Sequence, residues 1–289
     1  MRAADSNFRH QTNCRNQTNR ERMTVHDPPW REIAHRLVGV IDLKSGLAVH
    51  GVAGQRDNYS PVRLSCFRCG ALDGDPLHLL AHYQELGLKR FYIADLNSLG
   101  GGEIQQGAIE AIVEQAGPDA RWIIDAGLSD PSDTKTTQWL DRLTGPDLEA
   151  IRGSIHWVVA SESAINLDVA SGFAQILGAR RVILGIDFRS GQFMGPLADE
   201  SLDGLGNDSS LVTWVQRSAD AGIRSVLILD VAAVGTSQGP VSLANCRRFR
   251  RDHGDWEIIS GGGCRSPADA RAFLDAGCSD CMVATALHC

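Results

Sequence analysis

The sequence predicts a single α/β domain, a (β/α)8 TIM barrel built from two similar half-barrels. Two observations predict it. Eight short apolar runs rich in β-branched residues alternate with longer amphipathic stretches, and the last four runs repeat local patterns of the first four. The chain has 289 residues, and α/β barrels of about 250 residues are routinely one domain. An open doubly wound sheet is the alternative, and eight units favour the barrel.

The expected strands are continuously apolar, which is typical of parallel strands that are buried on both faces. In chain order they span 37–42, 90–95, 121–125, 156–160, 181–187, 225–230, 256–260 and 281–284. Between them lie helical patterns such as 76–86 and 211–221, which end at Gly87 and Gly222. Glycine is a common residue just after a helix, so these positions mark the expected helix ends.

The exit of the first strand repeats at the fifth. Residues 41–46 read Ile-Asp-Leu-Lys-Ser-Gly, and residues 186–191 read Ile-Asp-Phe-Arg-Ser-Gly. Strands two and six, three and seven, and four and eight also share short patterns, in the same order. We infer from these matches that the second half of the chain copies the first, with four βα units in each.

The N-terminal region divides into two parts. Residues 1–25 are polar and lack the apolar segment of a signal peptide, so we predict a disordered extension before a barrel over 26–289. Residues 28–36 have a helical pattern, with Trp30, Ile33, Ala34 and Leu37 on one face. Because too few residues follow the last strand for an eighth helix, we expect this segment to pack beside strands one and eight.

Composition excludes several classes of function. The net charge is −7 without a basic stripe, which argues against nucleic acid as a partner. No apolar run reaches the roughly 18 residues of a membrane span. The absence of an export signal predicts a cytoplasmic protein whose eight cysteines are reduced. The oligomeric state is left open, and a monomer is compatible with the sequence.

Two cysteine pairs have the spacing of zinc ligands. They are Cys66 with Cys69 and Cys278 with Cys281. In the expected barrel the first pair follows strand one and the second precedes strand eight, at opposite ends of the barrel. We therefore predict no metal site.

Aspartates end five of the predicted strands, where the active residues of this fold lie. They are Asp42, Asp95, Asp125, Asp187 and Asp230. Asp42 and Asp187 are equivalent in the two halves, so we expect them to face each other across the barrel mouth. Two such carboxylates can act as general base and general acid, and the sequence leaves open which is which. For Asp95 and Asp125 we favour the alternative, in which the carboxylate caps a loop or helix.

A glycine-rich turn follows the seventh strand and predicts a phosphate site, because uncovered backbone N–H groups bind anions. Thr285, after the eighth strand, would add a hydroxyl donor. The repeat predicts a second site after strands three and four, although Asp125 would repel a phosphate there. The candidate phosphate-binding residues of the two sites are Gly261, Gly262, Gly263 and Thr285, and Gly127 and Ser161.

Two long loops lie at the same end of the expected barrel, at 54–75 and 191–209. They are candidate lids, with ordinary surface insertions as the alternative. Arg56, Arg63 and Arg68 in the first loop would contact an anionic ligand or remain solvated.

Taken together, these residues resemble the histidine-biosynthesis barrel family, most closely its phosphoribosylformimino-aminoimidazole carboxamide ribotide isomerases. The resemblance spans roughly 38–287. It rests on Ile41-Asp42-Leu43, Asp75-Pro76, Asp95-Leu96, Asp187 with Arg189, Asp230, Gly235-Thr236, Gly239-Pro240, Ser260-Gly261-Gly262 and Ala286-Leu287. It implies a TIM barrel that binds a substrate with a phosphate at each end, with Gly235 and Thr236 as further binding residues. It also implies an Amadori rearrangement of an aminoaldose to an aminoketose by Asp42 and Asp187, without metal or organic cofactor.

The chain departs from the family pattern at three strand exits. Asp125-Ala126-Gly127 replaces a glycine-rich turn, Ala160-Ser161 replaces a Gly-Thr pair, and Val234 replaces the family's aspartate before Gly235. Two alternatives follow. One is a paralogue acting on another phosphorylated metabolite in one-carbon cofactor metabolism (methanopterin or methanofuran), and the other is a non-catalytic barrel that binds a phosphorylated ligand. The sister cyclase that takes ammonia from a glutaminase partner is disfavoured.

Overall fold

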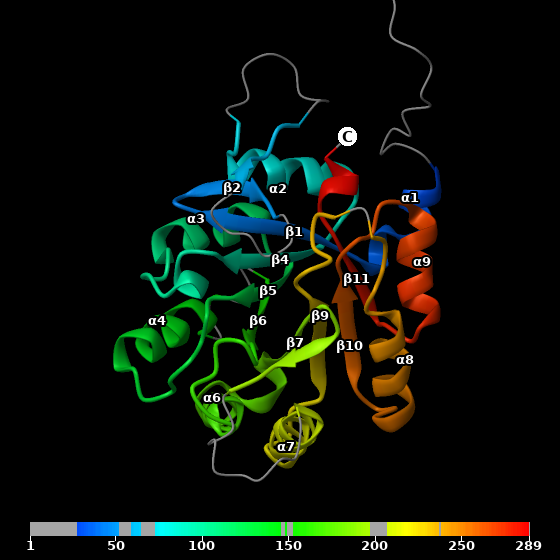
Figure 1. Ribbon diagram of the computed structural model, residues 1–289. Helices are drawn as coiled ribbons and strands as arrows, with labels where there is room; N and C mark the ends of the chain where they lie inside the picture. The colour runs from blue at the N-terminus through cyan, green and yellow to red at the C-terminus, as the bar shows by residue number, and fades with distance from the viewer. Residues whose placement is uncertain are drawn as a thin grey trace, which may run out of the picture.

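The computed structural model describes residues 28–51, 59–64, 73–145, 148, 153–196, 207–236 and 238–288. Within them, parallel strands form a closed barrel with helices around it (Figure 1). In ring order these strands are β1 (Leu37–Lys44), β4 (Arg90–Asp95), β5 (Arg121–Asp125), β6 (Ser154–Val159), β7 (Val182–Arg189), β9 (Ser225–Asp230), β10 (Glu257–Gly261) and β11 (Asp280–Val283). β11 pairs with β1 and closes the ring. The predicted (β/α)8 barrel is therefore confirmed, and the open-sheet alternative is wrong.

Helices connect the strands and cover the outside of the barrel (Figure 1). They are α1 (Pro28–Ile33), α2 (Pro76–Glu85), α3 (Gln106–Ala116), α4 (Thr134–Thr144), α6 (Val169–Leu177), α7 (Asn207–Asp220), α8 (Leu243–Asp252) and α9 (Pro267–Asp275), with short 3-10 turns η1 (Ala34–Arg36), η3 (Ser98–Gly100), η4 (Ala179–Arg181) and η5 (Thr285–Leu287). The predicted start of α2 is confirmed, since the Asp75 side chain accepts from the backbone N–H groups of Leu77 and His78. Among the described helices, none has the length and apolar character that a membrane crossing requires.

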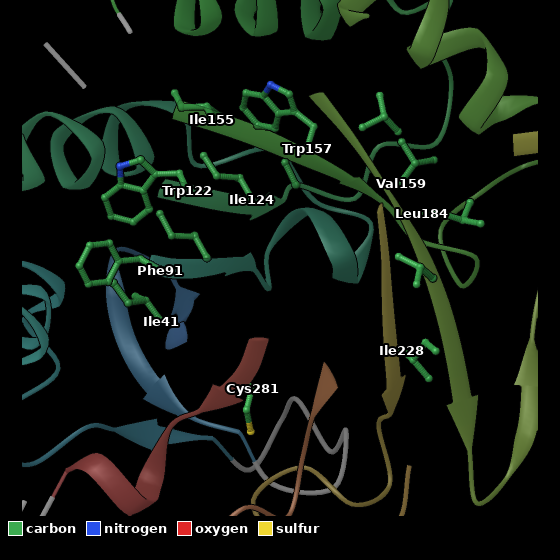
Figure 2. Close-up of a cluster of buried hydrophobic side chains, with 14 of the residues drawn as sticks. Ile41, Phe91, Trp122, Ile124, Ile155, Trp157, Val159, Leu184, Ile228 and Cys281 are labelled. Atoms are coloured by element: carbon green, nitrogen blue, oxygen red, sulfur yellow. The ribbon is translucent and has the colours of Figure 1, made fainter. Parts of the chain in front are cut away.

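Two separate apolar cores lie on the two faces of the strands. Outward-facing side chains pack against the helices, as Figure 2 shows for Ile41, Phe91, Trp122, Ile124, Ile155, Trp157, Val159, Leu184, Ile228 and Cys281. The inner face fills the barrel, and each strand contributes to it: Val38, Tyr92, Ile123, Val158, Ile183, Leu227, Ile259 and Met282. Burial on both faces explains why the strands read as continuous apolar runs.

Each of the two repeated strand exits forms a β-hairpin. β1 pairs antiparallel with β2 (Leu47–His50), and β7 pairs antiparallel with β8 (Gln192–Met194). Ser45 and Ser190 both have positive φ, 50° and 53°, and the glycine after each has φ 79°. A positive φ is uncommon outside glycine, so the repeated Ser-Gly pair adopts the same unusual conformation twice. Duplication of the half-barrel itself stays a prediction.

The N-terminal helical segment lies where it was expected. α1 packs beside α9 (Figure 1), and Trp30 and Ile33 are buried there. The Arg36 side chain donates to the Cys278 carbonyl at 2.9 Å, which ties η1 to the residues just before β11. The predicted disordered extension, residues 1–25, lies outside the described residues.

A charged pair spans the floor of the barrel, at the N-terminal ends of the strands. Arg121 on β5 donates to both carboxylate oxygens of Glu257 on β10, at 2.8 Å each. The Ser225 hydroxyl donates to the same carboxylate at 3.1 Å. A bidentate arginine–carboxylate pair is strong and geometrically specific, so this contact links strands on opposite sides of the floor.

We predict that Glu257→Gln lowers the free energy of unfolding by about 2 kcal/mol. The two side chains are only 23% and 28% exposed, so the substitution leaves the Arg121 charge poorly solvated and without its partner. Urea unfolding followed by circular dichroism measures the change. Glu114→Gln, on the exposed face of α3, is the matched control and should change stability by less than about 0.5 kcal/mol. An equal effect of both substitutions would contradict a structural role for the floor pair.

Candidate active site

A cavity of about 500 Å³ opens at the C-terminal ends of the strands. This is the end of an α/β barrel that carries function, and the size suits a small metabolite. Asp42, Asp187, Gly262, Gly263 and Thr285 all line it, so residues predicted separately from the sequence meet in one place.

Asp42 and Asp187 lie on opposite sides of this cavity. β7 is the fifth strand of the ring counted from β1, so the two strands stand across the barrel from each other. Asp42 is half-buried, whereas Asp187 is only 6% exposed. Gly51 lies against Asp42: a Cβ atom at Gly51 would come within 2.6 Å of Asp42 Oδ2. A side chain at position 51 would therefore displace the carboxylate.

The surroundings of Asp187 favour its protonated form. Burial, followed by the negative charges of Glu162 and Asp125, raises the pKa of Asp187 to about 8. The Ser161 hydroxyl at 3.2 Å and the Glu162 backbone N–H at 3.3 Å both bond to Asp187 Oδ2 and oppose part of the rise. At neutral pH this carboxyl therefore holds a proton that it can donate.

Four carboxyl groups converge on one buried tyrosine. The Tyr92 hydroxyl donates to Asp125 Oδ2 at 3.3 Å. Burial, and then the negative charges of Asp125, Asp42, Asp187 and Glu162, raise the pKa of Tyr92 well above its usual value. Tyr92 thus stays protonated as a hydrogen-bond donor on the inner wall of the site.

Asp95 and Asp230 hold loops together. Asp95 is fully buried and accepts from three backbone N–H groups, among them that of Gln105 at 2.6 Å. Asp230 accepts from the N–H groups of Ser190 and Gly191, in the turn of the second hairpin. The contacts of Asp95 are therefore those of a loop cap, as favoured from the sequence.

Asp125 has both of the roles considered for it. Its Oδ1 accepts from the Gly127 N–H at 3.2 Å, as a loop cap does, and the residue also lines the cavity. The loop contact fixes the orientation of a carboxyl group that faces the ligand space.

The glycine-rich turn after β10 borders the cavity with backbone. Gly262 and Gly263 have positive φ, 87° and 70°, and both line the cavity. A Cβ atom on Gly263 would lie 1.9 Å from the Gly239 carbonyl oxygen, so no side chain fits there. Gly261 is not among the lining residues, and a Cβ at that position would meet Met282. Gly261 therefore packs against β11, and its phosphate contact stays a prediction.

The two residues predicted to bind phosphate in the first half-barrel do not border the cavity. Gly127 and Ser161 are not among the lining residues, and the Ser161 hydroxyl is occupied by Asp187 and by the Met194 carbonyl at 2.5 Å. The cavity is bordered there by Asp125 and Glu162 instead. The structure thus does not bring the second predicted phosphate site together, because buried hydrogen bonds hold Ser161 away from the ligand space.

Further residues line the cavity. Gly235 and Thr236, named by the family resemblance, belong to it, and so does Arg265, which lies two residues after the glycine turn. Five lining residues were not predicted from the sequence: Tyr92, Glu162, Arg265, His50 and His288. Arg265 follows a predicted anion-binding turn, so its position in the sequence could have marked it as a phosphate-binding residue.

His288 closes the cavity near the C-terminus. Its Nε2 lies 2.8 Å from the Tyr83 hydroxyl, and its ring centroid lies 5.1 Å from that of His50, with the two rings tilted by 53°. Burial, followed by the nearby His50 and His82, lowers the pKa of His288 to about 3. The imidazole is therefore neutral at physiological pH and adds no positive charge to the site.

Among the described residues, no group of three or more His, Cys, Asp or Glu side chains is arranged to hold a metal ion. Cys278 and Cys281 are buried, 2% and 0% exposed. Cys66 and Cys69 lie outside the described residues, as do 54–58, 65–72 and 197–206 of the two candidate lid loops. In the described part of the first loop, Arg63 pairs with Asp73 at 2.8 Å and is not a lining residue.

Comparison with known proteins places the whole barrel in one group. Residues 36–289 match the family described as histidine biosynthesis protein. An uncharacterised protein of Methanocaldococcus jannaschii is 27% identical, over 88% of this chain and 93% of its own length. A phosphoribosyl imidazole-4-carboxamide isomerase of Alcanivorax borkumensis is 24% identical, over 87% and 92%. The imidazole glycerol phosphate synthase subunit HisF of Halobacterium salinarum is 23% identical, over 75% and 79%.

We predict that two substitutions move the pKa of Asp187 in opposite directions. Ser161→Ala removes a donor to the ionised carboxylate and raises the pKa above about 8, whereas Glu162→Gln removes a neighbouring negative charge and lowers it. The measurement is a 13C NMR titration of the aspartate carboxyl groups, with Asp187→Asn identifying the resonance. A pKa that neither substitution changes would show that the carboxyl does not depend on these neighbours.

Proposed function

The chain belongs to the histidine biosynthesis protein family, and from this premise we propose that it is an isomerase acting on a phosphorylated substrate. The reaction is an Amadori rearrangement, in which an aminoaldose becomes an aminoketose. The observation that carries the proposal is the pair of opposed carboxyl groups, Asp42 and Asp187, in one cavity, with Asp187 protonated at neutral pH. Sugar isomerisation of this kind requires one proton donor and one proton acceptor.

The geometry suggests a role for each aspartate. Asp187 donates its proton to the ring oxygen of the aminoaldose as the C1–O bond breaks, which leaves a C1=N iminium. Asp42, as the base, takes the proton from C2 to give an enaminol. Protonated Asp42 then gives this proton to C1, and the C2 hydroxyl passes its proton to the ionised Asp187, which leaves the ketone. The substrate ends as an isomer of itself, and both carboxyl groups return to their starting states.

Several groups that follow β9, β10 and β11 support phosphate binding on their side of the cavity. Gly262 and Gly263 present backbone without side chains, Thr236 and Thr285 supply hydroxyl groups, and Arg265 supplies a positive charge. Backbone N–H groups, hydroxyls and a guanidinium are the usual partners of a phosphate. A phosphate fixed at this end would hold the reacting carbons between Asp42 and Asp187.

The second candidate function is that of a paralogue that keeps this chemistry and takes a different phosphorylated substrate. The presence of Asp125 and Glu162, where a second phosphate site was predicted, favours it. A non-catalytic barrel would bind such ligands without turnover.

Asp42→Asn and Asp187→Asn should each lower the turnover of the histidine-pathway aminoaldose by roughly 10²- to 10⁴-fold, because each removes a proton-transfer group. Product formation is followed by chromatography, with melting temperature as the check on folding. Asp119→Asn, at an exposed ion pair with Lys89, is the matched control and should retain activity. A folded wild-type protein that does not isomerise this substrate would contradict the histidine-pathway assignment and leave the paralogue as the candidate to test.

The pH profile should separate the two aspartates. If Asp187 is the acid, kcat/KM falls as the pH rises above about 8, because the ionised carboxyl has no proton to donate. Glu162→Gln should move this falling limb to lower pH. Steady-state rates between pH 5 and 10 provide the measurement. A rate that instead rises through pH 8 would assign the base role to Asp187.

A further inference from the structure

His288 has a ring nitrogen without a hydrogen-bond partner, and the residue lies in the wall of the cavity. We propose that this nitrogen, Nδ1, accepts a hydrogen bond from a hydroxyl group of the substrate, so that His288 selects a hydroxylated carbon chain. The inference deepens the proposed function and rests on it for the phosphorylated substrate and its place in the cavity. It assigns a role to a residue that the acid–base chemistry of Asp42 and Asp187 does not use.

The helix α2 holds the C-terminal segment in place. The His82 Nε2 atom lies 2.7 Å from the Leu287 carbonyl oxygen, and because a carbonyl has no proton, His82 is the donor. The next residue of α2, Tyr83, is fully buried. A Cβ atom at Gly39 of β1 would come within 2.6 Å of the Tyr83 ring, so the ring packs directly on the strand backbone. The position of the Tyr83 hydroxyl is therefore fixed by β1.

The contacts of Tyr83 determine which nitrogen of His288 carries the proton. The Tyr83 hydroxyl donates to the Val40 carbonyl at 2.8 Å and also lies 2.8 Å from His288 Nε2. Its single proton is used toward Val40, because a carbonyl can only accept, so the Tyr83 oxygen accepts from His288 Nε2. Burial lowers the pKa of His288, and a neutral imidazole has one ring proton. Nδ1 is therefore a bare acceptor.

This acceptor has no partner within the part of the chain that the structure describes. Nδ1 of His288 is buried without a hydrogen bond, and the residue as a whole is 5% exposed. Buried acceptors in proteins are normally hydrogen-bonded, and an unpaired one lowers stability. An apolar side chain would pack at this wall without that loss. A donor group on a ligand in the cavity would supply the missing partner.

The location of His288 places this contact near the proposed base. β11, which precedes His288, is the neighbour of β1, which carries Asp42. The negative charge of Asp42 also acts on the Tyr83 hydroxyl that holds the His288 ring. The hydroxyl that His288 binds is thus on the Asp42 side of the substrate. A carboxylate or carbonyl oxygen there would meet the lone pair of Nδ1 and would be disfavoured.

His50 is the group that could compete with a ligand for Nδ1. It also lines the cavity, and its ring centroid lies 5.1 Å from that of His288. The two rings are tilted by 53°, and no hydrogen bond ends on His288 Nδ1 among the described residues. If His50 turned and donated to Nδ1 in the free protein, a substrate hydroxyl would find no acceptor. The first measurement below separates these two cases.

NMR of the wild-type protein labelled with 15N at histidine reports the state of each ring nitrogen. The 15N chemical shift distinguishes a protonated nitrogen, a bare one and one that accepts a hydrogen bond, and the signals of His288 are assigned through its own backbone. At pH 7 we expect Nε2 to be protonated and Nδ1 to be bare. Saturating ribitol 5-phosphate should shift Nδ1 to the position of a hydrogen-bonded acceptor. Pentyl phosphate, which has the same carbon chain without hydroxyls, should leave Nδ1 unchanged.

Isothermal titration calorimetry compares the Kd of the same two ligands for the wild type and for His288→Phe. The substitution should weaken binding of ribitol 5-phosphate by about three- to tenfold, as for one hydrogen bond, and change binding of pentyl phosphate by less than about twofold. His35→Phe, at an exposed histidine outside the cavity, is the matched control and should leave both Kd values unchanged. Melting temperatures check folding, and the NMR titration decides the matter if His288→Phe does not fold.

Several results would overturn the inference. They are a proton on Nδ1 or a bond from His50 to it in the free protein, an Nδ1 signal that ribitol 5-phosphate does not move, and an equal loss of affinity for both ligands. Ribitol 5-phosphate that binds the wild type no better than pentyl phosphate, including no detectable binding, would also overturn it. Isomerase activity without the hydroxyl contact rejects only the role of His288, whereas the contact without isomerase activity rejects only the reaction.

Discussion

The pairing of β1 with β11 is the contact on which the rest of the structure depends. A sheet of the same strands left open would place β1 and β7 in the same layer, and their carboxyl groups would share no cavity. Closure makes these strands opposite members of a ring and brings Asp42 and Asp187 to two sides of one space. At the N-terminal ends of the strands, the Arg121–Glu257 ion pair joins β5 to β10. The barrel is therefore held by hydrogen bonds between neighbouring strands and by this ion pair between opposite ones.

The different roles proposed for the two aspartates follow from their surroundings and not from their strands. Their strands carry the same local sequence and the same hairpin, with matching positive φ at Ser45 and Ser190. Their burial differs, however: Asp42 is half-buried, whereas Asp187 is 6% exposed and has its pKa raised by burial and by the charges of Glu162 and Asp125. A symmetric pair of backbones can therefore support an asymmetric reaction, because protonation depends on burial and nearby charge and not on the strand itself.

Much of the fold could be predicted from the sequence, because its signals are local. Every expected strand lies within two residues of an observed one, since burial on both faces leaves a continuous apolar run. Asp42, Asp187 and the glycine turn were found for a similar reason, as strand ends and turns have fixed positions in this fold. The contacts of Ser161 and the convergence of Glu162 on Asp187 were not predictable, because they join different strands and depend on side-chain direction across the mouth.

The close approach of Gly263 to Gly239 has a consequence for how such a site can change over evolutionary time. Where two backbones meet so closely that a Cβ would lie 1.9 Å from a carbonyl oxygen, single substitutions have almost no room to alter the contact. The opposite wall consists of side chains, and there one codon change at Asp125 or Glu162 exchanges charge for neutrality. We therefore expect the glycine turn to stay unchanged among related barrels. Differences in what these barrels bind should arise mainly from substitutions in the opposite wall.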